Sequence, residues 1–146
     1  MTTAAVTTPT GPDGTLPAFF ARLDDGDAES ASQFFTPDGL YVRPASDPSG
    51  ATTARTEVVS GRDAIRDYFR ERGRRPYRHQ VQSCVRAGDL VYGDGVAIHE
   101  SSGPFAVFVV RAALDNDGRF RRYVAGAVAL SAADITRLYP GLDRGV

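Results

Sequence analysis

Several residue types that carry chemistry in proteins are scarce in this chain of 146 residues. Cys84 is the only cysteine, which excludes a disulfide within the chain and agrees with a reducing compartment. The two histidines, His79 and His99, stand singly and give no metal-ligand spacing, so we predict no metal site. No phosphate-binding loop, nucleophile elbow or dinucleotide-binding glycine motif is present, and we expect no cofactor.

Long apolar runs and a strong net charge are also lacking. No stretch approaches the roughly 20 apolar residues of a membrane helix. The N-terminal residues have neither the basic start nor the apolar centre of a signal peptide, so we expect a flexible tail over residues 1–14 and a cytoplasmic protein without membrane contact. The net charge of -1 argues against nucleic-acid binding. Five arginines between Arg70 and Arg78 are interpreted as a solvated surface, with docking of an acidic carrier protein as the alternative.

Apolar residues at helical spacing predict three helices in the first half of the chain. The first covers about residues 15–25 and ends at Gly26, and Asp27 can cap a short second helix. The third begins at a capping-box-like pair, Ser60 and Asp63, and ends at Gly73. The stripe that predicts the first helix is Leu16, Phe19, Phe20 and Leu23.

The segment between the second and third helices contains turn signals and one short strand. Residues 36–39 favour a turn, and the strand 40–43 that follows is expected to stop at Pro44. Residues 45–56 have few apolar side chains, which predicts a surface loop, with a brief strand at Val58 and Val59 before the third helix.

Alternation on both sides of a turn at residues 87–89 predicts a hairpin from Tyr77 to Ile98. The alternation places His79, Val81, Ser83 and Val85 on one face of the first strand, and Tyr92, Asp94, Val96 and Ile98 on one face of the second. Each of these faces has one ionisable side chain among apolar ones. A lone ionisable group on an apolar face is costly to bury unless it is paired or used, so this hairpin is the first candidate for chemistry.

A second hairpin and a last helix complete an α+β pattern. Residues 105–114 and 120–130 form the hairpin, and Ser131 starts a helix that Pro140 should end. The prediction is therefore a single domain over residues 15–130, followed by a short helix and tail over residues 131–146.

Four sequence motifs occur in an order and spacing that resemble the nuclear transport factor 2-like superfamily, and within it the SnoaL-like polyketide cyclase group. The resemblance covers about residues 15–130. The motifs are the double helix from Phe19 to Phe35 with Gly26-Asp27 at its joint, the strand Leu40-Tyr-Val-Arg-Pro44, the helix entry Val59-Ser-Gly-Arg-Asp-Ala-Ile65, and the turn Leu114-Asp-Asn-Asp-Gly-Arg119.

The resemblance implies a cone-shaped barrel in which a curved antiparallel sheet wraps around the helices and encloses a small apolar ligand. It also implies a homodimer formed through the outer face of the sheet. The ketosteroid isomerases of this superfamily carry a tyrosine and two aspartates where this chain has Phe19, Arg43 and Val110, so the resemblance argues against that isomerase mechanism. The resemblance points the following residues into the cone: Tyr41, Arg43, His79, Asp94, Val96, Ile98, Phe108, Val110, Tyr123, Ala125 and Ala127.

His79, Asp94 and Arg43 are the predicted catalytic residues. A histidine can take or give a proton near neutral pH, a nearby carboxylate can orient it, and an arginine can stabilise an enolate. The alternatives are a hydrated histidine at the rim of the pocket and an Arg43–Asp94 ion pair that only holds the cone together. Substrate contacts are expected from Phe19, Tyr41, Tyr68, Val96, Ile98, Phe108, Val110 and Tyr123, although packing alone would also explain the tyrosines. His99 is expected at the surface, and Cys84 on the outward face of its strand without a nucleophilic role.

Together these patterns predict a cofactor-independent cyclase, isomerase or dehydratase. Its substrate would be a small apolar oxygenated molecule of secondary metabolism, such as a polyketide or terpenoid intermediate, transformed by acid-base catalysis. One alternative is a ring-closing pericyclase in which cavity shape does most of the work. The other is a non-catalytic binding or interaction module.

Overall fold

Six strands form one curved mixed sheet in the computed structural model, which describes residues 14–46 and 52–142. The strand order is β2-β1-β6-β5-β4-β3, and every neighbouring pair is antiparallel except β1 and β6, which are parallel. The predicted α+β class is confirmed, although the sheet is mixed and not wholly antiparallel. The strands are β1 (Phe35–Ser46), β2 (Thr52–Ser60), β3 (Tyr77–Ala87), β4 (Leu90–His99), β5 (Gly103–Leu114) and β6 (Phe120–Ala129).

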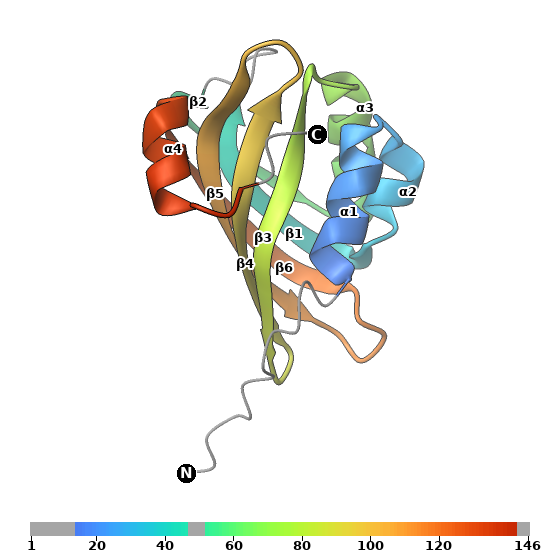
Figure 1. The fold of residues 1–146 in the computed structure, drawn as a ribbon. Helices are drawn as coiled ribbons and strands as arrows, with labels where there is room; N and C mark the ends of the chain where they lie inside the picture. The colour runs from blue at the N-terminus through green and yellow to red at the C-terminus, as the bar shows by residue number, and fades with distance from the viewer. Residues whose placement is uncertain (1–13, 47–51, 143–146) are drawn as a thin grey trace.

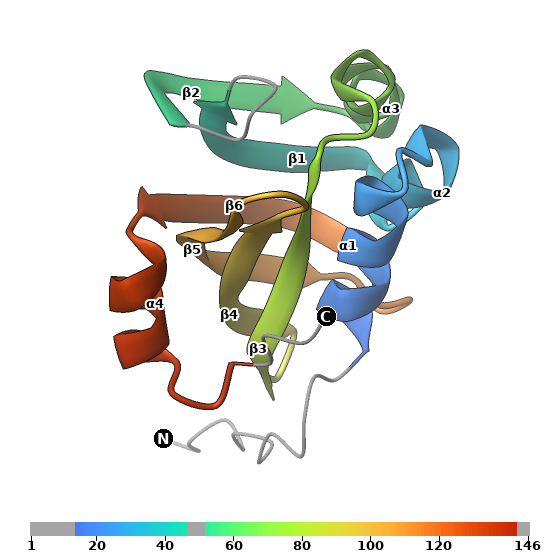
Figure 2. The same ribbon diagram turned by 45° about the horizontal axis from the view of Figure 1, so that its top comes forward.

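Four helices in the described part of the chain cover the sheet: α1 (Thr15–Asp24), α2 (Ala28–Ser32), α3 (Arg62–Arg72) and α4 (Ala132–Leu138). The first three lie together on one side of the curved sheet, and α4 lies on the opposite side (Figure 1, Figure 2). We call the side that faces α1–α3 the inner face and the side that faces α4 the outer face. None of the described helices is long and apolar enough to cross a membrane.

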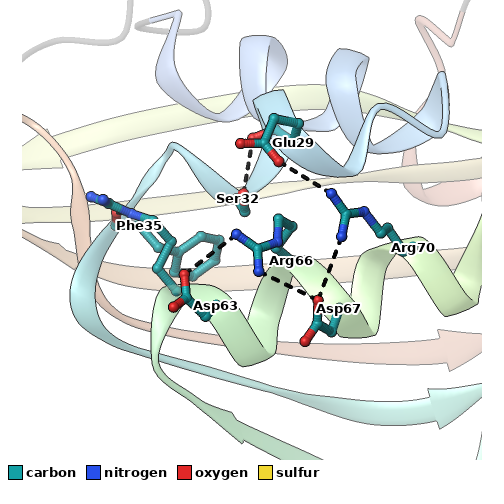
Figure 3. A network of polar contacts seen from close by, with 8 residues as sticks. Glu29, Ser32, Phe35, Asp63, Arg66, Asp67 and Arg70 are labelled. Carbon is teal, nitrogen blue, oxygen red and sulfur yellow. Dashed lines mark hydrogen bonds and ion pairs between the residues drawn. The ribbon is translucent and has the colours of Figure 1, made fainter.

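The predicted apolar stripe of α1 is buried as expected, and the Asp27 side chain caps α2 by accepting from the Ser30 N–H at 3.1 Å. A network of charged side chains joins α2 to α3, including an ion pair of 3.5 Å between Arg70 and Glu29 (Figure 3). The capping box predicted for α3 is wrong. Gly61 is the N-cap and gives no side-chain hydrogen bond, because Ser60 remains in β2, where it pairs with Leu40 of β1.

The first strand is longer than the sequence suggested. β1 runs through residues 36–39 and past Pro44, so the turn and the stop predicted there are wrong. A register shift between Phe35 and Leu40 accommodates the irregular part of the strand against β6. Pro44 lies beyond the last β1 residue that pairs with β6, at a position where a missing N–H is tolerated. The predicted loop 45–56 overlaps the described strand β2, and residues 47–51 lie outside the described residues, as does the predicted tail apart from Gly14.

A bulge in β3 changes which side chains of the β3–β4 hairpin face inward. The register shifts between Val81 and Ser83, so Gln82 is the extra residue. As a result Cys84 is buried in the inner core with 1% exposure, and Ser83 faces outward, which reverses the prediction for both. A one-residue shift reverses the facing of every later side chain of a strand.

Small residues form the inner face of β4. A Cβ at Gly93 would lie 2.5 Å from Leu16 Cδ1 of α1, and a Cβ at Gly95 would lie 2.2 Å from the Gln80 carbonyl oxygen. These glycines therefore let α1 and β3 pack closely against β4. Successive side chains of a strand point to opposite faces. Asp94, which lies between the two glycines, and Val96, which follows Gly95, therefore face outward.

Aromatic rings fill most of the space between the inner face and the helices. Phe19 is fully buried at the centre and packs against six other rings at centroid distances between 5.3 and 6.0 Å. On the outer face, Ile135 of α4 packs with Val96 and Ile98 in a second, smaller core. The Ser131 side chain caps α4, as predicted, by accepting from the Asp134 N–H.

Candidate acid-base site

His79 is held by a carboxylate that the sequence analysis did not select. Asp24, the last residue of α1, accepts from the His79 backbone N–H through Oδ2 at 2.7 Å and contacts the ring Nδ1 through Oδ1 at 2.7 Å. The two side chains are 13% and 15% exposed. The two carboxylate oxygens thus contact two different groups of His79, its backbone N–H and its ring, and hold both the strand and the ring in place.

Two features of the backbone bring these side chains together. β3 is one of the two edge strands of the sheet, and the His79 N–H is satisfied by Asp24 instead of a further strand. Helix α1 packs along β3, and the His79 ring stacks on Phe20 of α1 at 4.4 Å between centroids and an interplanar angle of 19°. Phe108 of β5 presents an edge to the same ring at 5.3 Å. The ring therefore has a defined orientation.

His79 lines a small, partly open cavity of about 50 Å³. Arg43 enters the cavity from β1, and its Nε donates to the Pro44 carbonyl oxygen at 2.8 Å. The remaining walls are largely apolar or aromatic: Phe20, Leu23, Tyr41, Pro44, Phe108, Tyr123, Ala125, Gly126 and Ala127. An apolar pocket with a few convergent polar groups is the usual form of a small-molecule site, although such sites commonly enclose about 300–1,000 Å³.

Two tyrosines supply hydroxyl groups at this end of the core. Burial raises the pKa of Tyr41, an effect that the charge of Arg43 and a side-chain hydrogen bond to it partly oppose. Burial also raises the pKa of Tyr123 well above its usual value, and the neighbouring Tyr41 adds to the rise. The two rings stack at 5.0 Å with an interplanar angle of 29°. Both hydroxyls therefore remain protonated at neutral pH and can donate hydrogen bonds.

Asp94 is not part of this site, which corrects the prediction that it faces the cone together with His79. It lies on the outer face, where it accepts from the Tyr139 hydroxyl at 2.6 Å and from the Ser83 hydroxyl. The predicted inward positions of Val96 and Ile98 are wrong for the same reason, since both pack against α4. The β3 bulge and the inward glycines of β4 set this arrangement, and neither feature follows from strict alternation.

The other predicted site residues take two kinds of position. Tyr41, Arg43, His79, Phe108 and Tyr123 border the cavity. The rest belong to the surrounding core or pack on it: Phe19, Tyr68 and Val110. Their predicted contact with a substrate remains a prediction.

Asp24 carries a sequence signal that helical spacing could have revealed. It stands four residues after Phe20, so the two side chains share one face of α1. It also lies at the C-terminal end of the helix, where the helix dipole disfavours a negative charge. A carboxylate that extends an apolar stripe at the unfavourable end of a helix needs another reason to be there, and His79 supplies it.

Metal chemistry has no candidate in the described parts of the chain. No group of three or more His, Cys, Asp or Glu side chains in residues 14–46 and 52–142 is placed to hold a metal ion.

Comparison with known families gives one domain match over most of the chain. The model of the SnoaL-like domain matches residues 16–138. A comparison with curated proteins gives no significant match.

Solved structures with the same fold come from several bacteria. A candidate isomerase of the SnoaL-like family from Agrobacterium tumefaciens has 16% identity and a TM-score of 0.61, over 78% of this chain and 94% of that one. A protein from Catenulispora acidiphila with a ketosteroid isomerase-like fold, in complex with trimethylamine, has 14% identity and a TM-score of 0.59, over 79% and 85%. A candidate isomerase from Bacillus subtilis has 17% identity and a TM-score of 0.54, over 88% and 91%. At these identities the likeness shows a shared fold.

Proposed function

Because the chain belongs to the SnoaL-like domain family, we propose that it is an enzyme that moves a proton on a small apolar oxygenated molecule without a cofactor, with His79 as the acid-base group. An isomerase-type reaction suits this proposal best, since structural relatives include candidate isomerases. Dehydration or ring closure by the same group are variants of it. The observation that carries the proposal is the Asp24–His79 contact beside the cavity.

The contact with Asp24 determines how His79 would work. In the proposed mechanism the carboxylate accepts from Nδ1–H, which would leave the Nε2 lone pair of a neutral ring available as the base. Nε2 would remove a proton from a carbon next to a carbonyl group. Asp24 would then stabilise the imidazolium, which returns the proton at another carbon and completes an isomerisation.

Arg43 and Tyr41 would stabilise the oxyanion that proton removal generates. Arg43 brings a positive charge to the cavity, and the buried hydroxyl of Tyr41 is a hydrogen-bond donor at neutral pH. Donors that are already oriented toward a developing negative charge are worth more in a buried site than in water. The apolar remainder of the cavity would hold the hydrocarbon part of the substrate and exclude water.

The size of the cavity favours a second candidate, a non-catalytic binding or interaction module. A volume of about 50 Å³ is far below the roughly 300–1,000 Å³ that small-molecule sites commonly enclose. A substrate of ten or more atoms requires the aromatic walls to move apart. If they do not move, the cone is a packed core and the protein acts through its surface.

Proton exchange in deuterated water tests the catalytic proposal. The purified protein is incubated with a panel of cyclic ketones and enones, and deuterium incorporation next to the carbonyl is followed by NMR. We expect exchange that His79→Gln lowers by about 100-fold or more, because a general base contributes about 10²–10⁴-fold. His99→Gln is the matched control, since His99 contacts Ser101 near the surface and is not part of the cavity.

Three outcomes distinguish the candidates. Equal losses in the two variants would reject His79 as the base. Turnover of a ring-forming substrate that stays within a few-fold of wild type in His79→Gln would favour a pericyclase in which cavity shape does the work. Absence of both exchange and binding across the panel would favour the non-catalytic module.

Two partners and the biological setting stay proposals. A second copy would dock on the outer face of the sheet, where Val109, Val124 and Val128 are 60%, 42% and 57% exposed, and light scattering would detect the dimer. An acidic carrier protein near Arg70–Arg78 has weaker support. Arg70 pairs with Glu29 and Arg74 with Glu100, so part of that charge is already neutralised. A role in secondary metabolism is proposed on the resemblance alone, and a cytoplasmic location stays an expectation.

A further inference from the structure

Arg72, the last residue of α3, is a buried cation that pairs with no carboxylate of the described residues. It is 8% exposed, its Nε has no hydrogen-bond partner, and none of the ion pairs found in residues 14–46 and 52–142 involves it. Burying a charge is costly, and buried charges in proteins are usually paired. Packing alone does not explain why the chain keeps an arginine at this position.

The guanidinium group of Arg72 joins three segments of the chain. Its Nη1 donates to the Leu23 carbonyl oxygen at 3.4 Å and to the Gly73 carbonyl oxygen at 3.2 Å, at the C-terminal ends of α1 and α3. Its Nη2 donates to the Tyr77 hydroxyl at 3.3 Å, at the start of β3. The C-terminal ends of both helices are negative, which partly compensates the buried positive charge.

The two residues that Arg72 contacts on α1 and β3, Leu23 and Tyr77, each lie close to one member of the Asp24–His79 pair. Leu23 directly precedes Asp24. Tyr77 lies two residues before His79 on the same face of β3, and its ring presents an edge to the His79 ring at 5.6 Å. Arg72 touches neither Asp24 nor His79, yet it holds the helix end that carries the carboxylate against the strand that carries the imidazole.

The Asp24–His79 contact requires such control. One carboxylate has to meet a backbone N–H and a ring nitrogen of the same residue, each at 2.7 Å. A small shift of the end of α1 along the edge of β3 would lengthen both bonds, because they share one side chain. No further strand pairs with β3 on this side to restore the alignment, since β3 is an edge strand of the sheet.

We propose that Arg72 is a positioning residue that sets the geometry of the Asp24–His79 pair through Leu23 and Tyr77. The inference rests on the site of the proposed function, but its test reads the pair directly and needs no substrate. A failure to find turnover would leave the Arg72 result intact, and a failure of the Arg72 test would leave His79 available as the base.

NMR of uniformly nitrogen-15-labelled protein provides the measurement, because it shows His79 together with the other amides of β3. Two signals report on the contact: the ring Nδ1–H of His79 and the hydrogen exchange of its backbone N–H. His99 is an internal reference in the same spectrum, since its Nδ1 contacts Ser101 and not Asp24. Asp24→Asn, which removes the negative charge and one of the two acceptor oxygens, is the reference for a weakened contact.

Arg72→Met is the decisive variant, because an apolar side chain of similar length can replace a buried charge with little change in stability. We expect the Nδ1–H signal to move toward its position in Asp24→Asn, and the His79 N–H to exchange roughly tenfold faster relative to the other amides of β3. Arg70→Met is the matched control on the same helix. Arg70 is largely exposed, and its loss should leave both His79 signals unchanged.

Unchanged His79 signals in a folded Arg72→Met protein would overturn the proposal. A general acceleration of all β3 amides without a preference for His79 would also overturn it, since that is the result of a purely structural role. If Arg72→Met does not fold, Tyr77→Phe gives the decision. It removes only the hydroxyl that Arg72 contacts and leaves the ring beside His79, so a selective change at His79 supports the proposal and no change rejects it.

Discussion

One aspartate lies against each face of the β3–β4 hairpin, and the two aspartates have different surroundings. On the inner face, Asp24 from α1 meets His79 beside an apolar cavity that also contains Arg43. On the outer face, Asp94 accepts from Tyr139 and Ser83 and ties the end of α4 to the sheet. A carboxylate paired with an imidazole can take part in proton transfer. A carboxylate paired with two hydroxyl groups serves to hold two elements together.

The comparison separates two roles that a sequence cannot distinguish for a lone aspartate in a strand or at a helix end. The groups that the aspartate contacts, and whether it lies next to a cavity, define its role. Asp24 has a titratable partner next to a cavity, whereas Asp94 has a tyrosine on the opposite face of the sheet.

The largest effect that tests this comparison is on catalysis. Asp24→Asn keeps the size of the side chain but removes the acceptor charge that stabilises the imidazolium, so we expect proton exchange to fall by about 100-fold. Asp94→Asn, the matched change on the outer face, should leave the rate within a few-fold of wild type. The deuterium assay measures both. Equal losses would mean that the two carboxylates do not differ in role.

The next effect concerns the close packing of the inner face. Gly95→Ala would place a Cβ 2.2 Å from the Gln80 carbonyl oxygen and 2.5 Å from Phe108 Cζ. Because one of these neighbours is backbone, we expect a loss of about 2 kcal/mol in the free energy of unfolding, measured in urea. Gly126→Ala is the control, since its Cβ would meet only Val109 Cγ2 at 3.7 Å, and we expect a change below about 0.5 kcal/mol. Equal stability of the two variants would contradict the packing described for β4.

The smallest effect concerns the outer face. Tyr139→Phe removes the hydrogen bond to Asp94, and we expect a loss of about 1 kcal/mol in the free energy of unfolding at neutral pH, with unchanged proton exchange. Burial, together with the hydrogen bond and the charge of Asp94, raises the pKa of Tyr139 to about 12.

The pH dependence of that difference follows from the direction of the shift. A pKa that is higher in the folded state means that folding favours the protonated phenol. The stabilisation is therefore complete below the unfolded pKa of about 10 and is lost as the pH rises through about 12. Denaturant unfolding of wild type and Tyr139→Phe between pH 8 and 12 should give curves that converge. A constant difference over this range would show that the pKa of Tyr139 is the same in the folded and unfolded states, which would contradict the contact described with Asp94.

The sequence by itself determined the α+β class, the apolar face of α1, the caps of α2 and α4, and the existence of both hairpins. These features depend on periodicity, capping residues and turn residues, which act over a few neighbouring positions. The inward orientation of Tyr41, Arg43, His79, Phe108, Val110 and Tyr123 also followed from strand alternation guided by the resemblance.

Only the tertiary structure decided the partner of His79 and the side on which Asp94 lies. One inserted residue at Gln82 reverses the facing of Ser83 and Cys84, and an alternating pattern of apolar residues does not reveal the insertion. Asp24 and His79 are 55 positions apart, and their contact depends on α1 packing along the edge strand, a contact that Arg72 also bridges. Local sequence patterns set the elements, while long-range packing set which ionisable groups meet, because a proton can pass only between atoms that the fold brings within hydrogen-bond distance.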